Sequence, residues 1–364
     1  MLLKECCFLV KDKIDSKKLN KLNYISTENL NSNFNGFSEA SSLPCGNVTR
    51  VQSGDILISN IRPYFKKGLF CCFDGGCSND VFCIRNNSDS YINKYLYYAL
   101  CSDCFIDKLV MSCKGTKMPR GDKNVLLNYN LPDIDIAKQQ HIVNILGTFD
   151  DKIENLENCN NKLIDYSKDL YNKYFSQCEE KTLLSNIATM KSGFAFKSDW
   201  WQPTGVPVIK IANIDNSLNM EVCSFVSNDK IDIAKEFIAN QGDIVFAMTG
   251  ATLGKFCIVP KHDGTYLVNQ RVGKFFIKNN NLPFLYCTLK AKKVFESIIN
   301  LGSGSAQPNI SAIDINNLLV KYNKTLVEKF NNQLNPIFNK IINNTYTIQK
   351  LNKLKHLYLK KFFG

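Results

Sequence analysis

The sequence predicts an α+β protein built as an internal repeat, with two similar mixed α/β domains and two long helices that pack together as a coiled coil. Two observations predict this fold class. A heptad spacing of bulky residues occurs twice, at an offset of 188 residues. Short strand and turn motifs recur in the same order at nearly the same offset. Two units of about 180 residues are each long enough to bury a core.

The two helical runs cover residues 137–175 and 325–362. Bulky residues recur along both at steps of four and three, which is the pattern of a coiled-coil seam. Polar residues interrupt this pattern at Asn160, Ser167, Asn344 and Lys355. We expect the helix-pairing positions to be Ile142, Leu146, Phe149, Ile153, Leu156, Leu163, Leu334, Ile337, Ile341, Ile348 and Leu351.

Each run carries a helix breaker at nearly the same place, Gly147 in the first and Pro336 in the second. This predicts a short helix, a kink and then a long helix in both copies. The segment from Asp150 to Phe175 is about 26 residues long and would form a rod of roughly 39 Å. The resulting domain boundaries are 1–133 and 179–322 for the mixed domains, with helical segments at 134–178 and 323–364.

Composition limits the class of protein. The net charge is +12, which favours a polyanionic partner. Lys4 and Glu5 lie where a signal peptide would be apolar, so we expect the fifteen cysteines to be thiols in a reducing cytoplasm. Cys101 and Cys104 have metal-ligand spacing, but no second pair accompanies them. No apolar run reaches the ~18 to 20 residues of a membrane span.

Two loops of the first domain gather positive charge. A turn and buried strand at 54–59 lead to a segment where Arg62, Lys66 and Lys67 alternate with aromatic residues. A strand near 77–84 and an amphipathic helix near 91–109 precede the second loop, which contains Lys114, Lys117, Arg120 and Lys123. Such loops are suited to phosphate and base contacts. A solvated hairpin tip is the alternative interpretation of the first one.

The second domain repeats these motifs with different loop residues. Gly242–Ala247 matches Gly54–Ser59, residues 269–272 match 79–81 loosely, and residues 304–309 match 115–120. In contrast, Thr249-Gly250-Ala251 stands where the first domain has Arg62-Pro63-Tyr64. One scaffold with two sets of loop residues predicts two different binding specificities.

The order of these motifs resembles that of the DNA-specificity (S) subunits of type I restriction-modification systems, over nearly the whole chain. The segments that carry the resemblance are Leu131-Pro132, Gln139–Val143, Phe149–Ile153, Gly193–Phe196, Gly242–Val245, Asn269–Arg271 and Gly302–Ser311. None of them is decisive alone. Their order around two heptad helices is specific.

The resemblance implies two target recognition domains that each read one part of a split, asymmetric duplex DNA site. It also implies that the long helices are antiparallel, act as a spacer with pseudo-two-fold internal symmetry, and dock two modification subunits, which restriction subunits then join. The chain itself would be a non-catalytic subunit without a cofactor. A rod of roughly 40 Å agrees with the ~34 Å length of one turn of B-DNA.

We expect the DNA contacts to divide by chemistry. Lysines would bind phosphates, and planar side chains that form two hydrogen bonds would read base edges. The candidate phosphate contacts are Lys66, Lys67, Lys114, Lys117, Lys123 and Lys255. The candidate base readers are Arg62 and Arg120 in the first domain, and Gln270, Arg271, Gln307 and Asn309 in the second.

Two other classes of function remain open at this point. Asp133, Asp150 and Lys152 fit the loose pattern of a stand-alone metal-dependent nuclease, although acidic residues at the start of a helix are more simply explained as N-terminal caps. A nucleic-acid-binding scaffold, including one for RNA, is the other alternative. Residues 250–255 imitate a phosphate-binding loop but lack its spacing and its Ser or Thr.

Overall fold

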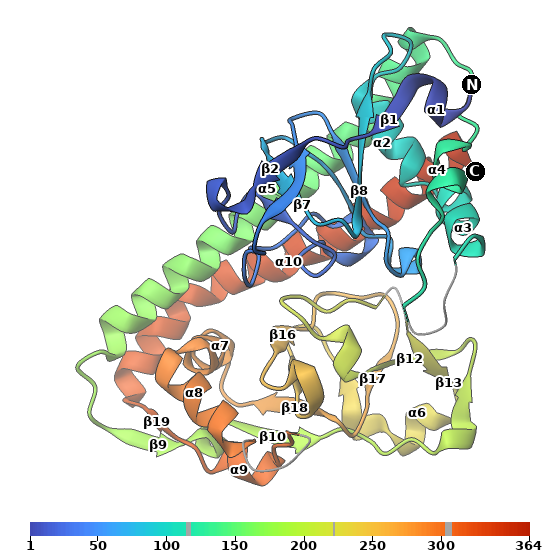
Figure 1. Cartoon of the computed structure of the whole chain (residues 1–364). Helices are drawn as coiled ribbons and strands as arrows, with labels where there is room; N and C mark the ends of the chain where they lie inside the picture. The colour runs from blue at the N-terminus through green and yellow to red at the C-terminus, as the bar shows by residue number, and fades with distance from the viewer. Residues whose placement is uncertain (114–117, 221–222, 303–307) are drawn as a thin grey trace. The chain divides into compact units, whose positions relative to one another are not determined.

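The computed structural model describes residues 1–113, 118–220, 223–302 and 308–364 (Figure 1). The chain divides into two compact units. Unit 1 comprises Met1–Lys152 and Leu351–Gly364, and unit 2 comprises Ile153–Lys350. The long helices α5 (Ile136–Phe175) and α10 (Lys324–Phe363) each contribute residues to both units.

Unit 1 contains two four-stranded sheets. The first is antiparallel, and its strands are β1 (Cys7–Leu9), β8 (Val81–Asn86), β5 (Ile56–Ser59) and β6 (Gly68–Phe70), in that order across the sheet. The second has the order β2 (Lys13–Asp15), β4 (Asn47–Val51), β7 (Gly75–Cys77) and β3 (Tyr24–Ile25). The helices are α1 (Leu3–Cys6), α2 (Asn93–Leu100), α3 (Asp103–Met111) and α4 (Lys123–Leu127), and the 3₁₀ turns are η1 (Ser16–Lys18), η2 (Ser32–Phe34) and η3 (Pro63–Phe65).

Unit 2 repeats this plan. Its antiparallel sheet has the order β10 (Ala188–Ser192), β18 (Val272–Ile277), β15 (Ile244–Ala247) and β16 (Phe256–Ile258). A five-stranded sheet has the order β11 (Trp201–Gln202), β13 (Ser224–Val226), β12 (Val206–Ile209), β17 (Tyr266–Val268) and β14 (Ile238–Ala239), and β19 (Leu319–Lys321) pairs with β9 (Lys181–Leu183). The helices are α6 (Lys230–Ile233), α7 (Leu282–Lys290), α8 (Lys292–Leu301) and α9 (Ala312–Asn316), and the 3₁₀ turns are η4 (Leu184–Asn186), η5 (Ser198–Trp200), η6 (Ile211–Asn213), η7 (Lys235–Phe237) and η8 (Gly250–Thr252).

The central strand of each antiparallel sheet explains the apolar runs of the sequence. Ile56 and Ile58 of β5 pack into the core with the helices of unit 1, and Leu57 packs into a second core on the opposite face. In β15, Ile244 and Val245 divide in the same way. Because strand side chains alternate between faces, a strand that is covered on both faces must be apolar throughout.

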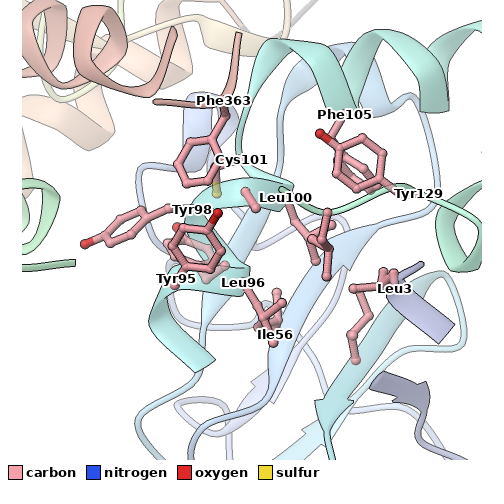
Figure 2. Close-up of a cluster of buried hydrophobic side chains, with 14 of the residues drawn as sticks. Leu3, Ile56, Tyr95, Leu96, Tyr98, Leu100, Cys101, Phe105, Tyr129 and Phe363 are labelled. Carbon is pink, nitrogen blue, oxygen red and sulfur yellow. The ribbon is translucent and has the colours of Figure 1, made fainter. Parts of the chain in front are cut away.

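Aromatic side chains close the helical core of unit 1 (Figure 2). The ring of Tyr95 on α2 lies 5.3 Å from that of Phe363 on α10, and the ring of Phe105 on α3 lies 5.0 Å from that of Tyr129. All four side chains are buried. Burying an aromatic side chain of this kind contributes about 2–3 kcal/mol, so Phe363 in the last turn of α10 adds to the stability of unit 1.

The matched Gly-Asp turns have the same structure in the two units. Gly54 and Gly242 have φ angles of 92° and 88°, which glycine adopts without strain. The aspartate that follows accepts a hydrogen bond from a backbone amide of its own turn and pairs with a cation on the neighbouring strand of the sheet. The cation is Arg85 in unit 1 and Lys274 in unit 2, two positions apart along equivalent strands. A shift of two keeps the side chain on the same face of the sheet.

The structure corrects the expected helix boundaries. The single helix expected near 91–109 is two helices, because α2 ends at Leu100 and Ser102 caps the start of α3 by accepting a hydrogen bond from the Phe105 amide. The expected kinks do not divide the long helices, since α5 and α10 each run unbroken for 40 residues. Pro336 is on the exposed side of α10, where water can satisfy the carbonyl that it leaves unpaired. Gly147 is buried opposite Tyr98.

The long helices pair antiparallel within unit 2. Near one end of the pair, Tyr174 donates a hydrogen bond to Gln333, and towards the other end Asn160 accepts one from Asn344. In unit 1, the ring of Phe149 on α5 packs 5.5 Å from that of Tyr358 on α10. The expected fold class of two similar mixed units with two long, paired helices is therefore confirmed.

Candidate nucleic-acid interface

Three loops meet at one point of unit 1. They are the loop after β5, the turn before β8 and the loop before α4. The Asn60 amide donates to the Asp80 carbonyl at 2.8 Å, the Gly121 amide donates to the Asn60 carbonyl at 3.0 Å, and the Arg62 amide donates to the Pro119 carbonyl at 2.8 Å. We call these loops the unit 1 junction; it comprises residues 59–67, 78–80 and 118–122.

The equivalent loops of unit 2 meet through the same three bonds. Here the Met248 amide donates to the Arg271 carbonyl at 3.1 Å, the Ile310 amide to the Met248 carbonyl at 3.0 Å, and the Gly250 amide to the Pro308 carbonyl at 3.2 Å. We call this the unit 2 junction; it comprises residues 247–255, 269–271 and 308–310. One pattern of backbone bonds therefore builds both sites.

These bonds correct one detail of the sequence comparison. Arg62 is equivalent to Gly250, not to Thr249, and both have left-handed backbones, with φ angles of 48° and 76°. Glycine adopts this conformation freely, whereas for an arginine it costs about 1 kcal/mol. Strained residues of this kind cluster at functional sites. Unit 1 thus holds an arginine where the backbone favours glycine.

Arg120 is the most clearly placed of the predicted base readers in unit 1. Its guanidinium donates to Asp80 at 3.0 Å, and its side chain is 54% exposed. Together with Asn60 and Lys123 it lines a pocket of about 290 Å³, whose other lining residues are Phe82, Gly121 and Asp122. The pocket of the unit 1 junction is thus lined by two cations, the carboxylate of Asp122 and the amide of Asn60.

The two lysines that follow Arg62 in the same loop, Lys66 and Lys67, do not line this pocket. Lys66 forms an ion pair of 2.6 Å with Asp103, at the start of α3. The ammonium of Lys67 donates to the Thr27 carbonyl at 2.7 Å, and burial lowers the pKa of Lys67. Both ammonium groups therefore have partners within unit 1. Lys114 and Lys117 lie outside the described residues.

The predicted readers of unit 2 are more open. Gln270, Arg271 and Asn309 are all exposed at the unit 2 junction. Lys255, in the same loop as Gly250, pairs with Asp215 at 2.8 Å, and both side chains are about half exposed. The remaining predicted reader, Gln307, lies outside the described residues. The structure therefore brings Gln270, Arg271, Asn309 and Lys255 into one set of loops.

Sequence reasoning missed three junction residues. Asp80 of unit 1 is equivalent to Arg271 of unit 2, so the charge at this position is reversed. Asn60 lines the pocket, and Thr249 forms an isolated β-bridge with Asn309. The repeat offset could have identified both loop positions, because Asn60 directly follows β5 and Thr249 is the second residue after β15.

The helix-pairing positions fall into two groups. Ile142, Leu146 and Leu334 are buried in the unit cores, with Phe149 and Ile337 packed against them. Ile341 is also buried. The remaining positions are half-buried; they are Ile153, Leu156, Leu163, Ile348 and Leu351. This pattern fits a two-helix pair whose ends enter larger cores.

Three of the four polar residues that interrupt the seam form polar contacts between the two long helices. Asn344 donates to Asn160 at 2.8 Å, and both are buried in unit 2. In unit 1, Lys355 forms an ion pair of 2.5 Å with Asp150, which also accepts a 2.6 Å hydrogen bond from Tyr98. Burial, and then the Asp150 carboxylate, raise the pKa of Tyr98. We name these two contacts the amide pair and the charged pair.

The interpretation of Asp150 as a helix cap is wrong. Helix α5 begins at Ile136, so Asp150 is in its interior, far from the positive end of the dipole. Its carboxylate is held by Tyr98 and Lys355, which leaves Lys152 exposed on the same helix. Asp150 therefore joins α5 to α2 and α10, and this arrangement does not resemble a nuclease centre.

The described part of the chain holds no group of three or more His, Cys, Asp and Glu side chains that is arranged to bind a metal, and Cys101 and Cys104 are free thiols. Among the same residues, no helix combines the length and apolar character that crossing a membrane requires.

Comparisons with known proteins agree with this architecture. A model of the type I restriction modification DNA specificity domain matches residues 3–164 and again 179–355. The specificity subunit of the MjaVIII type I restriction enzyme of Methanocaldococcus jannaschii is 26% identical over 291 residues, 71% of this chain and 66% of that subunit. The MjaIX specificity subunit of the same organism is 23% identical over 303 residues, 76% of this chain and 69% of that one.

A solved structure shares the fold. The type I restriction-modification S subunit from M. genitalium has a TM-score of 0.55 and 19% identity, over all of this chain and 95% of that one. The matched relatives are specificity subunits, so the expectation of a non-catalytic recognition subunit is confirmed. With two matches that together span most of its length, the chain belongs to the type I restriction-modification DNA specificity family.

Proposed function

We propose that this chain reads a bipartite, asymmetric duplex DNA site for a type I restriction-modification complex, with one half-site bound at each junction. The observation that carries this proposal is the duplicated junction, in which equal backbone bonds present unequal side chains. A split, asymmetric DNA site requires two domains that share a backbone scaffold but present different base-contacting side chains. The net charge of +12 supports binding to a polyanion.

The division of labour follows from the side chains. Arg62 and Arg120 in unit 1, and Gln270, Arg271 and Asn309 in unit 2, would read base edges, because guanidinium and amide groups form paired hydrogen bonds with bases. Lys123 and Lys255 would bind phosphates, with Lys66 contributing after release from Asp103. We leave Lys67 out of this surface, because its ammonium is half-buried on a carbonyl.

The long helices would serve assembly. We propose that α5 and α10 set the distance between the half-sites and dock two modification subunits, and that restriction subunits join this complex in the cytoplasm. Lengthening both helices by matched insertions should then lengthen the gap between the half-sites. Each inserted residue would add about 1.5 Å.

The test is to map methylated sites in the host genome with and without this gene, and then with single substitutions. We expect a bipartite motif that disappears without the gene. Arg120→Ala should relax one half of the motif and Asn309→Ala the other half. Matched controls are Lys17→Ala and Lys181→Ala, since both lysines are exposed on elements outside the junctions. If both reader variants relaxed the same half, the assignment of one half-site to each unit would be wrong.

A further inference from the structure

The two junctions share a second property besides their backbone bonds. Among the residues that the structure describes, four buried side-chain oxygens have no hydrogen-bond partner; they belong to Asn60, Tyr95, Thr249 and Thr252. Three of these four lie in the loop that follows the central strand, after β5 in unit 1 and after β15 in unit 2. Folded proteins leave few buried polar atoms unpaired, because each one has lost its bonds to water. Their concentration at the two junctions therefore needs an explanation.

In unit 1, the unpaired oxygen adjoins a hollow. Asn60 lines the junction pocket together with Arg120 and Lys123. Both backbone polar groups of Asn60 are satisfied within the junction, through Asp80 and Gly121. The buried side-chain oxygen Oδ1 has no hydrogen-bond partner. A ligand group that enters between the exposed rim residues could supply it.

In unit 2, two hydroxyl groups occupy the corresponding loop. Thr249 forms a β-bridge with the exposed Asn309, and Thr252 ends the 3₁₀ turn η8. Gly250, between them, has the left-handed backbone that in unit 1 belongs to Arg62. A hydroxyl can both donate and accept a hydrogen bond, so the two oxygens can each serve a ligand.

We propose that Asn60 in unit 1, and Thr249 and Thr252 in unit 2, are specificity-determining residues whose side-chain oxygens bond to base edges when duplex DNA opens the junctions. This inference rests on the proposed function. An amide is suited to the paired donor and acceptor of adenine, whereas a threonine hydroxyl accepts several bases and its methyl group contacts thymine. The three residues thus give the two half-sites different chemistry.

This role has a signature that a structural role lacks. Replacing an unpaired buried polar group by an apolar group of similar shape removes a penalty, so the free protein should not lose stability. Replacing a paired one leaves its partner unsatisfied and destabilises the fold. A reader should therefore lose discrimination without any loss of thermal stability.

The experiment uses the full chain in complex with its modification subunits. Its affinity is measured for a duplex that carries the mapped site and for duplexes with one base pair changed. Thr249→Val, Thr252→Val and Asn60→Leu should keep or raise the melting temperature. The threonine variants should lower discrimination about tenfold at one half-site, and Asn60→Leu should do so at the other. Thr249→Ser keeps the hydroxyl and should retain discrimination.

Matched controls come from buried polar residues that do have partners. Thr288 on α7 is hydrogen-bonded to Tyr171, and Asn29 bonds to the Tyr24 and Ser38 carbonyls. Thr288→Val and Asn29→Leu should lower the melting temperature and leave discrimination unchanged. Asn60→Ala provides a smaller replacement if Asn60→Leu does not fold.

The possible outcomes distinguish a failure of the proposed function from a failure of this inference alone. If the unmodified complex prefers no bipartite site, the proposed function fails, and this inference fails with it. If the complex prefers its site but the valine and leucine variants discriminate equally well, only this inference is overturned. A drop in melting temperature with unchanged discrimination would show that the three oxygens have a purely structural role, and would also overturn it.

Discussion

The unit 1 and unit 2 junctions share a backbone and almost no side chains. The same three hydrogen bonds join their loops, yet Arg62, Asp80 and Arg120 of unit 1 are replaced by Gly250, Arg271 and Asn309. Backbone bonds between loops depend little on side-chain identity, so loop residues can change while the geometry stays. The comparison teaches that in this fold the backbone positions the base-contacting residues, whereas the identity of their side chains can vary independently.

The polar contacts between the long helices also differ between the two units. In unit 1 a charged pair, Asp150 with Lys355, replaces apolar contacts in the seam, whereas unit 2 uses the amide pair of Asn160 and Asn344. A single polar contact in an apolar seam favours one register, because any shift would leave its groups unpaired. Each unit thus fixes the alignment of its helices by a different interaction.

The largest effect should come from charging equivalent core positions of the two units. Leu146 and Leu334 are 188 residues apart and both 0% exposed. Leu146→Asp or Leu334→Asp should lower the free energy of unfolding by several kcal/mol, since each buries an unpaired charge. Thermal unfolding followed by circular dichroism measures this.

Exposed residues on the same helices provide the control. Asn144→Asp and Asn332→Asp are also 188 residues apart and face solvent, so they should leave the melting temperature nearly unchanged. If the two leucine variants unfolded like the wild type, the equivalence of the two helical cores would be disproved.

The charged pair should be the more costly seam contact to break. Lys355→Met leaves the Asp150 carboxylate half-buried with Tyr98 as its remaining partner, which should cost about 1–3 kcal/mol of unfolding free energy. The double variant Asp150→Leu/Lys355→Met should recover most of that loss. Denaturant titration of the single and double variants measures the coupling.

The amide pair provides the contrast. Replacing both members, Asn160→Leu with Asn344→Leu, should leave stability equal or higher, because both polar groups leave together. A large loss of stability in this double variant would contradict the interpretation of the pair as a determinant of register.

Substitutions at the two left-handed positions, Arg62 and Gly250, should change the free energy of unfolding by an intermediate amount. Arg62→Gly should raise the free energy of unfolding by about 1 kcal/mol, because glycine adopts a φ of 48° without strain. The same variant should weaken recognition at the half-site of unit 1. In the opposite direction, Gly250→Ala should destabilise unit 2. Chemical denaturation of both variants tests whether Arg62 and Gly250 occupy equivalent positions.

The smallest effect concerns the Lys66–Asp103 ion pair of unit 1. Partial burial acts to raise the pKa of Asp103, but the hydrogen bond and charge of Lys66 outweigh it and hold the pKa below its ordinary 3.8. Because the folded pKa is the lower one, the pair stabilises the fold above that pH and loses its effect as the pH falls through the folded pKa. Solvent screens both side chains, so the effect should be slight.

The measurement is the melting temperature of wild type and Asp103→Asn from about pH 6 to about pH 2. The difference between them should shrink as the medium becomes more acidic. A difference that grew at low pH would contradict the assigned sign. Unit 2 has Lys292 at the start of α8 where unit 1 has Asp103, so this dependence belongs to unit 1 alone.

Much of the fold followed from local patterns. Heptad spacing identified α5 and α10, and the matched Gly-Asp turns located the central strands β5 and β15. Helix ends were harder to place. Asp150 follows a glycine and an apolar run, as a cap would, but the helix had already begun 14 residues earlier at Ile136. A buried Gly147 can remain helical when its neighbours pack well, and the sequence does not display that packing.

By itself, the sequence determined that this protein is doubled, that its apolar spacing makes two long helices, and that its loops differ between the copies. These properties depend on residues near one another in the chain. Only the tertiary structure decided which loops meet, that Asn160 pairs with Asn344 and Asp150 with Lys355, and that Asn60, Thr249 and Thr252 remain unpaired. Such contacts join residues that are distant in the chain, and local spacing carries no information about which distant partner a polar group will find.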